Sequence, residues 1–356
     1  MKILPFSLPY LVPLSMIASY LCGYWWTLQA MAWIPLIVAV LDMFVGLDTL
    51  NPTNVEAENL SHIAASRLVL YLWLPVQTAL IVCGLLMVTE ESLTMTDRVY
   101  LIVSAGMVIG MTNGTFGVAV AHELMHRPGW FEQRLAELLM AMVSYTHFCI
   151  EHVHGHHNNV GMTKDPATAR FGESFYTFYP RTVLGGLMSA WKLEVARLRR
   201  FGVHIASFHN RMLRYFVTLI VTYAVIGQVF GWLGVTFFAV QSVVGFSILE
   251  LINYVEHYGL TRREIVPGRY ERVTHRHAWN SNHRISNWLL FNVGRHSDHH
   301  HQAGRCYPAL RHADDAPQLP ASYFAMFALA LLPPLWRHVM DPQVVAWRRK
   351  NEETIK

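Results

Sequence analysis

Long apolar runs alternate with short polar connections up to residue 121, and again between residues 213 and 256. Each run has roughly the 20 residues that a helix needs to cross the hydrocarbon core of a bilayer. The pattern predicts an all-α integral membrane protein, a six-transmembrane-helix bundle in one domain covering residues 1–356. The expected transmembrane helices are residues 5–24, 28–48, 67–89, 99–121, 213–232 and 235–256.

Three further segments follow from the same pattern. A short turn near residues 25–29 joins the first two spans. Residues 135–150 are apolar but short, and we expect a buried or re-entrant helix there, because both ends must lie on one side of the membrane. Residues 323–336 carry a Pro-Pro pair and are expected to lie at the membrane surface or to pack on the bundle.

Composition supports a membrane protein and sets its orientation. The chain is 53% hydrophobic and 15% charged, whereas soluble domains carry about 25% charged residues. Arginines collect between residues 127 and 214 and again in the C-terminal tail. By the positive-inside rule, segments 122–212 and 257–356 should be cytoplasmic. Six spans then place both termini in the cytoplasm.

Histidine is the second unusual feature of the composition, with 20 residues that gather where apolar runs end. The motifs are AHELMHR, EHVHGHH, NYVEHYG and GRHSDHH. Polar groups at membrane depth are costly and indicate function. Nine histidines are candidate metal ligands: His122, His126, His152, His156, His157, His257, His296, His299 and His300.

Nine imidazoles exceed the needs of one metal ion and suit two ions with four or five nitrogens each. On an α-helix His152 and His156 share a face and can hold one ion, while His157 can reach a second. Imidazole binds zinc, copper, iron and nickel, so ligand type leaves the metal open. Six further histidines are expected outside the ligand set: His147, His154, His275, His277, His283 and His301.

Carboxylates stand beside these histidines in the sequence. A metal-bound imidazole usually donates its other N–H to such a group, so their expected role is to orient the ligands. Direct binding of a metal by one of them stays open, and no catalytic residue is expected beyond the ligands. The candidates are Glu123, Glu151, Asp165, Glu256 and Asp298.

With these motifs laid out, the chain resembles the integral-membrane alkane monooxygenases (alkane 1-hydroxylases), relatives of xylene monooxygenase and of the membrane fatty acid desaturases. HELMHR, EHVHGHH, NYVEHYGL and RHSDHH carry the resemblance, together with HAWNSNHRISNWLLF and DPATARFGES. It implies a bacterial inner-membrane enzyme whose two non-haem iron ions are bound by the nine histidines. Such an enzyme uses O2 to hydroxylate the terminal methyl group of an alkane.

The same resemblance implies that a rubredoxin and its reductase supply electrons. The four cysteines are isolated, which excludes a rubredoxin within the chain. Arginines beside the site, among them Arg262, Arg263, Arg295 and Arg305, offer a positive face to an acidic carrier. An apolar substrate can arrive from the bilayer through a channel, which we expect the first four spans to line.

Three other functions stay open. Many alkane hydroxylases have lysine directly after the first motif, whereas this chain has Arg127. Arginine at this position is similar to the xylene-type branch, so a methyl-group hydroxylase of alkylarenes stays open. The HxxxH and HxxHH spacings also fit a fatty-acyl desaturase. A metal transporter is the non-enzyme alternative, although transporters usually show internal repeats and sites at the bilayer midplane.

Overall fold

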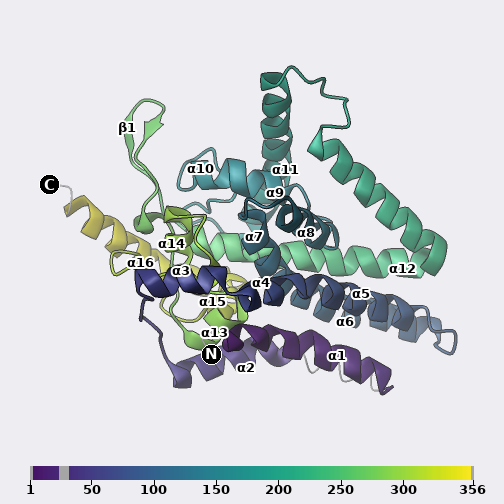
Figure 1. Ribbon diagram of the computed structural model, residues 1–356. Helices are drawn as coiled ribbons and strands as arrows, with labels where there is room; N and C mark the ends of the chain where they lie inside the picture. The colour runs from purple at the N-terminus through teal and green to yellow at the C-terminus, as the bar shows by residue number, and fades with distance from the viewer. Residues whose placement is uncertain (1–2, 24–31, 354–356) are drawn as a thin grey trace.

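The computed structural model describes residues 3–23 and 32–353 (Figure 1). Within these residues four helices are long and apolar enough to cross a membrane. They are Leu4–Leu21, in which η1 (Leu4–Tyr10) continues into α1 (Leu11–Leu21), Ala64–Val88, Met95–Met125 and α12 (Arg211–His257). The second consists of α4 (Ala64–Tyr71) and α5 (Trp73–Val88), and the third of α6 (Met95–Thr112), η3 (Asn113–Gly117) and α7 (Val118–Met125).

Two predicted spans meet inside α12. Gly231 has φ 63° and ψ −167°, a backbone conformation that is essentially restricted to glycine, and it divides α12 into two arms. These arms follow the predicted spans 213–232 and 235–256. The predicted span 28–48 contains α2 (Ile34–Val45), which is shorter than a full span. The predicted turn at residues 25–29 lies outside the described residues.

The remaining elements surround one end of this bundle. They include a small antiparallel hairpin of β1 (Glu264–Val266) and β2 (Arg269–Tyr270), within a chain that is mostly helical, as the all-α prediction expected. The hairpin projects away from the body of the molecule in Figure 1. The other helices are α3 (Asn54–His62), α8 (Trp130–Ala141), α9 (Phe148–Ile150), η4 (Glu151–His156), α10 (His157–Asn159), α11 (Phe175–Arg200), η5 (His275–His277), α13 (Arg284–Leu289), η6 (Val293–Arg295), α14 (His296–His301), η7 (Tyr307–Ala309), α15 (Tyr323–Ala330) and α16 (Pro333–Glu353).

The apolar segment 135–150 is a bent hairpin and not the single helix expected. Helix α8 ends at Ala141, and the chain reverses at Ser144, which has φ 55°. The Ser144 hydroxyl donates to Ser242 on α12, which ties the bend to the bundle. The segment then re-enters the protein as α9, directly before the EHVHGHH motif. Segment 323–336 likewise forms two helices, since α15 ends before Pro333 and α16 begins there.

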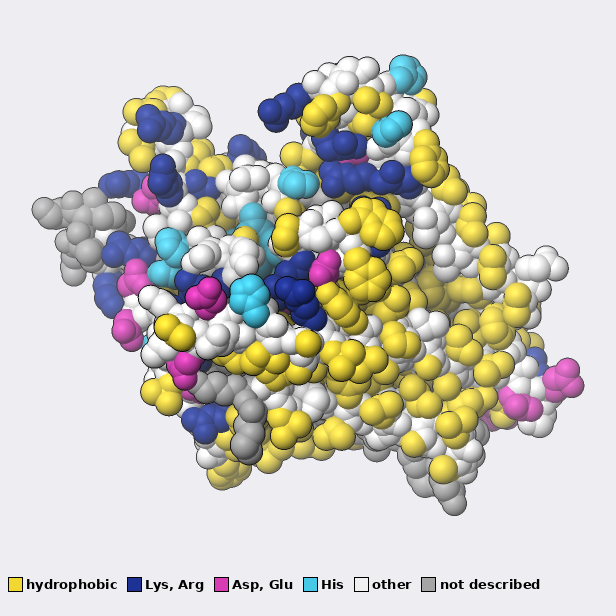
Figure 2. All heavy atoms as spheres, in the orientation of Figure 1, with side chains coloured by type: hydrophobic (Ala, Val, Ile, Leu, Met, Phe, Trp, Pro, Cys, Tyr) yellow, Lys and Arg dark blue, Asp and Glu magenta, His cyan; other side chains and the backbone are white. Residues whose placement is uncertain are grey.

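The C-terminal arm of α12 packs tightly against α6. A Cβ atom at Gly110 would lie 2.6 Å from the Gln241 carbonyl oxygen, so only glycine permits this approach. Figure 2 shows hydrophobic side chains over the face of the helical bundle, with Lys, Arg and His gathered toward the other end of the molecule. This distribution positions the histidine-bearing helix ends at the polar end of an apolar bundle.

Candidate metal centre

Four separate segments bring the histidine motifs together at this end of the bundle. His122 and His126 lie at the C-terminal end of α7, and His257 is the last residue of α12. The turn η4 and helix α14 supply the other two motifs. Because the long helices end at similar depth, residues up to about 180 positions apart in the sequence become neighbours.

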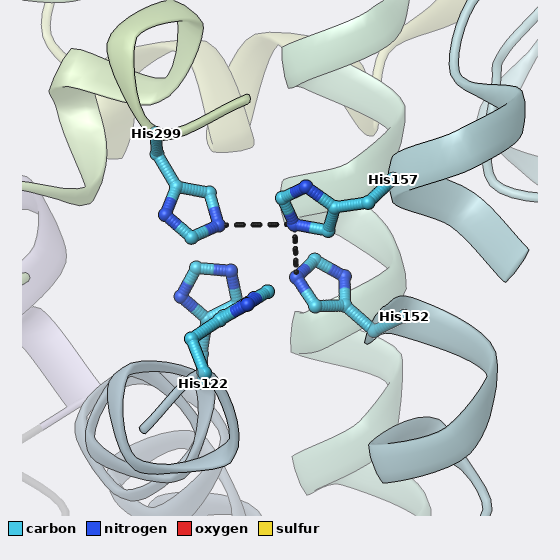
Figure 3. A group of neighbouring side chains, drawn as sticks. His122, His152, His157 and His299 are labelled. Atoms are coloured by element: carbon cyan, nitrogen blue, oxygen red, sulfur yellow. Dashed lines mark hydrogen bonds between the residues drawn. The ribbon is translucent and has the colours of Figure 1, made fainter. Parts of the chain in front are cut away.

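The nine histidines form two groups. The ligand nitrogens within each group all lie within 4.8 Å of one another. In the first group His157 Nε2 lies 3.1 Å from both His152 Nε2 and His299 Nε2 (Figure 3). The larger group contains His122, His126, His152, His157 and His299, and the smaller one contains His156, His257, His296 and His300.

The second group is equally close. His257 Nε2 lies 3.1 Å from His156 Nε2 and 3.2 Å from His296 Nε2, and His296 Nε2 lies 3.0 Å from His300 Nε2. All four residues of this group are buried. Five and four nitrogens match the numbers expected for two metal ions, and the structure places both sets side by side.

The grouping corrects the expected pairing within EHVHGHH. His152 falls in the larger group with His157, whereas His156 belongs to the smaller one. The reason is that Glu151–His156 is a π-helical turn, in which hydrogen bonds run from residue i to i+5. A wider turn aligns residues five apart, so His152 and His157 share a face and His156 points elsewhere. Single turns of this kind inside α-helices are frequent at functional sites.

The donor set fits a metal ion chemically. Nε2 of His122 and of His126 are buried without a hydrogen-bond partner among the described residues. Leaving a buried polar atom unpaired costs about 1–3 kcal/mol, which a bound ion would remove. Burial also lowers the pKa of His152, His157 and His299 well below its usual value. These imidazoles are therefore neutral at pH 7, the form that binds metals.

Two of the five carboxylates touch histidines of the two groups. Asp165 Oδ2 accepts a hydrogen bond from His156 Nδ1 at 2.8 Å, on the ring atom that faces away from its group, as expected for an orienting partner. Burial opposes protonation of His156, but Asp165 outweighs it and raises the pKa of His156. Glu256 differs, because its Oε2 lies 3.2 Å from His296 Nε2 and so approaches the ligand atoms themselves.

The other three carboxylates have different partners. Glu123 pairs with Arg127 and accepts from the Tyr307 amide. Asp298 accepts from Arg305. Glu151 Oε1 has no hydrogen-bond partner among the described residues, and burial together with the neighbouring Asp165 raises the pKa of Glu151 to about 8. The expected orientation of histidines by these three groups has no support in the contacts.

The six histidines expected outside the ligand set lie outside both groups in the described chain. His154 and His301 are exposed, and His277 Nδ1 accepts a hydrogen bond from the Thr274 amide in the loop after the β-hairpin. His147 has a buried Nε2 with no hydrogen-bond partner among the described residues.

A narrow apolar cavity of about 30 Å³ reaches the two groups. His122 and His152 of the larger group and His296 of the smaller one form part of its wall. The remaining wall comes mainly from α7, the C-terminal arm of α12 and the segment around α13: Val118, Ala119, Leu249, Ile252, Leu290 and Val293. Of the first four predicted spans, only the fourth, through α7, contributes described residues to this inner cavity.

A second apolar cavity lies between α1, α2, α6 and α15. Val12, Pro35, Val108 and Phe324 line it, together with Phe116 at the π-helical turn η3. Here the first, second and fourth predicted spans do contribute.

Sequence reasoning missed one buried acidic residue close to the site. Glu250 stands seven residues before His257 within the apolar C-terminal arm of α12. Its side chain is buried and accepts hydrogen bonds from Tyr145 and Thr182. A carboxylate inside a predicted span indicates function, so the sequence alone could have identified Glu250 as a candidate.

Comparison with known proteins agrees with this arrangement. Residues 98–330 match the fatty acid desaturase family. The chain is 39% identical to alkane 1-monooxygenase 2 of Pseudomonas aeruginosa, covering 93% of this chain and 90% of the relative. It is 41% identical to alkane 1-monooxygenase 1 of the same organism, over 88% of this chain and 81% of the relative. Identity to the xylene/toluene monooxygenase hydroxylase component of Pseudomonas putida is 30%, over 96% and 89%. The chain therefore belongs to the fatty acid desaturase family, among its membrane alkane 1-monooxygenases.

Proposed function

We propose that this protein is a non-haem di-iron monooxygenase that hydroxylates the terminal methyl group of alkanes to 1-alkanols with O2. The observation that supports this most is the pair of histidine groups, five and four residues, at the end of an apolar cavity. Nitrogen ligands suit iron, and the alkane 1-monooxygenase relatives supply the reaction. All nine histidines are proposed ligands, with one iron in each group.

The irons, when bound, would supply the activation of dioxygen. The chain itself contributes positioning and exclusion of water. Asp165 holds His156 in one tautomer, because its carboxylate accepts the Nδ1–H and leaves Nε2 free for the metal. The aliphatic wall of the inner cavity would hold a methyl group beside the ligands, and a cavity this narrow excludes bulk water.

The proposed topology has six spans in the bacterial inner membrane, with both termini in the cytoplasm. Its support is the division of α12 at Gly231 into two arms and the apolar α2, in addition to the remaining three long helices. The proposed cytoplasmic face is the histidine-rich end, where arginines also gather (Figure 2).

The proposed electron donors are a rubredoxin and its reductase. Arg263 is exposed beside the β-hairpin and suits an acidic carrier. Arg295 does not, because it is buried and donates to the backbone carbonyls of Leu310 and Asp48. Arg305 is held by Asp298 and Gln302, and Arg262 mainly by the Glu271 carbonyl. The docking role predicted for Arg295 was therefore wrong.

A methyl hydroxylase of alkylarenes is the second candidate, because the xylene/toluene relative covers nearly the whole chain. The experiment that separates the candidates uses purified protein in nanodiscs, with metal analysis followed by reductant-driven turnover under O2. Two irons per chain and 1-octanol from octane would support the proposal. A benzylic alcohol from xylene without octanol would favour the second candidate, and an alkene from an acyl chain would indicate a desaturase. Zinc without oxygen consumption would refute the oxygenase.

A further inference from the structure

Three cavities lie in series between the protein surface and the candidate metal centre. The outermost is an open groove of about 500 Å³ with Lys164 and Arg170 at its edge. A small cavity lies next to this groove, and Pro166 lines both. Phe148 and Asn253 in turn line both the small cavity and the apolar cavity at the histidines. Shared lining residues therefore place the small cavity next to both the open groove and the cavity at the histidines.

The small cavity has the size and lining of a water site. Its volume is about 10 Å³, roughly that required by one water molecule, which needs two to four polar partners. His147 Nε2 and Glu151 Oε1 belong to lining residues, are buried and have no hydrogen-bond partner among the described residues. A water molecule between these side chains and Glu250 would satisfy atoms that otherwise carry a cost of about 1–3 kcal/mol each.

Glu250 is the acidic group of this cavity that stands apart from the histidine ligands. Tyr145 and Thr182 donate to its two carboxyl oxygens, each at 2.8 Å, and Asn253 donates at 3.2 Å. No Lys or Arg side chain in the described residues forms an ion pair with it. A carboxyl group buried in an apolar helix without a counter-ion is costly and indicates function.

We propose that the small cavity holds a water molecule, and that this water and the Glu250 carboxyl group carry protons from the open groove to the metal centre. This inference rests on the proposed hydroxylation. In that reaction the O–O bond breaks, one oxygen atom enters a C–H bond and the other leaves as water. The carrier protein supplies two electrons, and two protons must cross an apolar wall. Asn253, which lines both inner cavities, stands at the last boundary on this route.

Two variants test the route without altering a histidine. Glu250→Gln keeps the size of the side chain and one of the two accepting oxygens, but it cannot exchange a carboxyl proton. Gly186→Ala adds a methyl group to the wall of the small cavity. Outside its own helix, the only described heavy atom within 4 Å of the new carbon is Glu151 Cγ at 4.0 Å. Alanine also favours the helix, so this change should displace the water and preserve the fold. Glu137→Gln is the control, because Glu137 likewise accepts from a tyrosine, Tyr215, away from the cavities.

The measurements are iron per chain, the rate of reductant-driven O2 consumption with octane, and its solvent deuterium isotope effect. We expect both variants to bind parental amounts of iron, to turn over about tenfold more slowly or worse, and to show a larger isotope effect. Glu137→Gln should match the parent in all three. Parental rates and isotope effects in both test variants would overturn the proton route and leave the proposed function standing.

Loss of rate together with loss of iron, at an unchanged isotope effect, would assign Glu250 a purely structural role and would also overturn the route. If the parent protein itself consumes no O2, the proposed function fails, and the route falls with it.

Discussion

Side chains at this site are of two kinds. Some place a nitrogen among the proposed ligand atoms, and others hydrogen-bond the ring nitrogen of a histidine that points away from them. Asp165 is of the second kind, with contacts to His156 Nδ1, to the Thr168 hydroxyl and to the Ala167 amide. His257 is of the first kind, since its Nε2 faces two other histidines. Substitutions at the two positions should therefore differ in severity.

Replacement of His257 by alanine should abolish alkane hydroxylation and reduce bound iron, because only three imidazoles remain in its group. Iron analysis and octane turnover of the purified variant provide the measurement. The matched control is His154→Ala, since His154 is exposed and lies outside both groups. Full activity of the His257 variant, or loss of iron in the control, would contradict the nine-ligand arrangement.

Asp165→Asn should weaken iron binding about tenfold while permitting some activity at saturating iron. The amide can still accept from His156 Nδ1, but it lacks the negative charge that strengthens the ligand. Iron titration of apoprotein measures the change. The control is Asp97→Asn, which alters the capping box at the start of α6. This carboxylate lies at the opposite end of the Met95–Met125 helix from His122, so iron affinity should stay unchanged.

At the scale of elements, unusual backbone geometry places the ligands and turns the helices. In the π-helical turn η4, neighbouring histidines point into different groups. At Gly231 the non-helical backbone divides α12 into two arms. Glu194 then joins α11 to the start of α12, accepting from Arg197 at 2.7 Å and from the Arg211 amide at 2.8 Å. Each feature has a measurable energetic consequence.

Gly231→Ala should destabilise the protein by about 1–3 kcal/mol, because this backbone conformation strongly disfavours any Cβ atom. Among the described residues, no heavy atom beyond its chain neighbours and its own helix backbone lies within 4 Å of the added carbon, so the cost isolates backbone strain from crowding. Thermal unfolding in detergent measures it. Gly227→Ala, at a helical position with ordinary contact at 3.4 Å, should be neutral or stabilising by up to about 1 kcal/mol.

The stabilising effect of Glu194 should depend on pH in a defined direction. Burial opposes ionisation of Glu194, but hydrogen bonds from Arg197 and Arg211 outweigh burial and lower the pKa of Glu194 to about 2, from an ordinary value of 4.5. A depressed carboxyl pKa stabilises the folded state above the unfolded pKa, and that stabilisation is lost as pH falls toward the folded pKa.

Thermal unfolding of Glu194→Gln and of the parent should therefore differ at pH 7, by about 1–3 kcal/mol, and converge as pH falls from 5 to 2. The exposed Glu91→Gln should show no difference from the parent at either end of this range. A difference for Glu194→Gln that is constant with pH would indicate lost packing and not lost charge.

At the scale of the whole molecule, the site lies at one end of an apolar bundle, and orientation in the membrane decides which partners reach it. In intact cells a membrane-impermeant thiol reagent should label Ser92→Cys, in the exposed connection before α6, beyond the parental background. Arg269→Cys, on the hairpin at the histidine-rich end, should react only after the cells are opened. The reverse pattern would overturn the proposed cytoplasmic placement of the site.

Local chemistry allowed much of this molecule to be predicted from its sequence. The helical bundle was predicted from apolar runs of span length and from the distribution of arginines, which depend only on residue type and short spacing. The positions of His122, His126 and His257 at the ends of such runs made them candidate ligands. The family was evident from the same motifs and is confirmed by the comparisons.

Only the tertiary structure decided how these parts divide and connect. The α-helical period paired His152 with His156, but the π-helical turn separates them, because packing of η4 against its neighbours overrides the local period. Arg295 appeared to be a surface charge, yet the folded chain surrounds it with carbonyl oxygens. The three cavities and the position of Glu250 among them depend on side chains from α9, α11 and α12 that come together in the folded chain. The spacing of these residues along the sequence does not predict that contact.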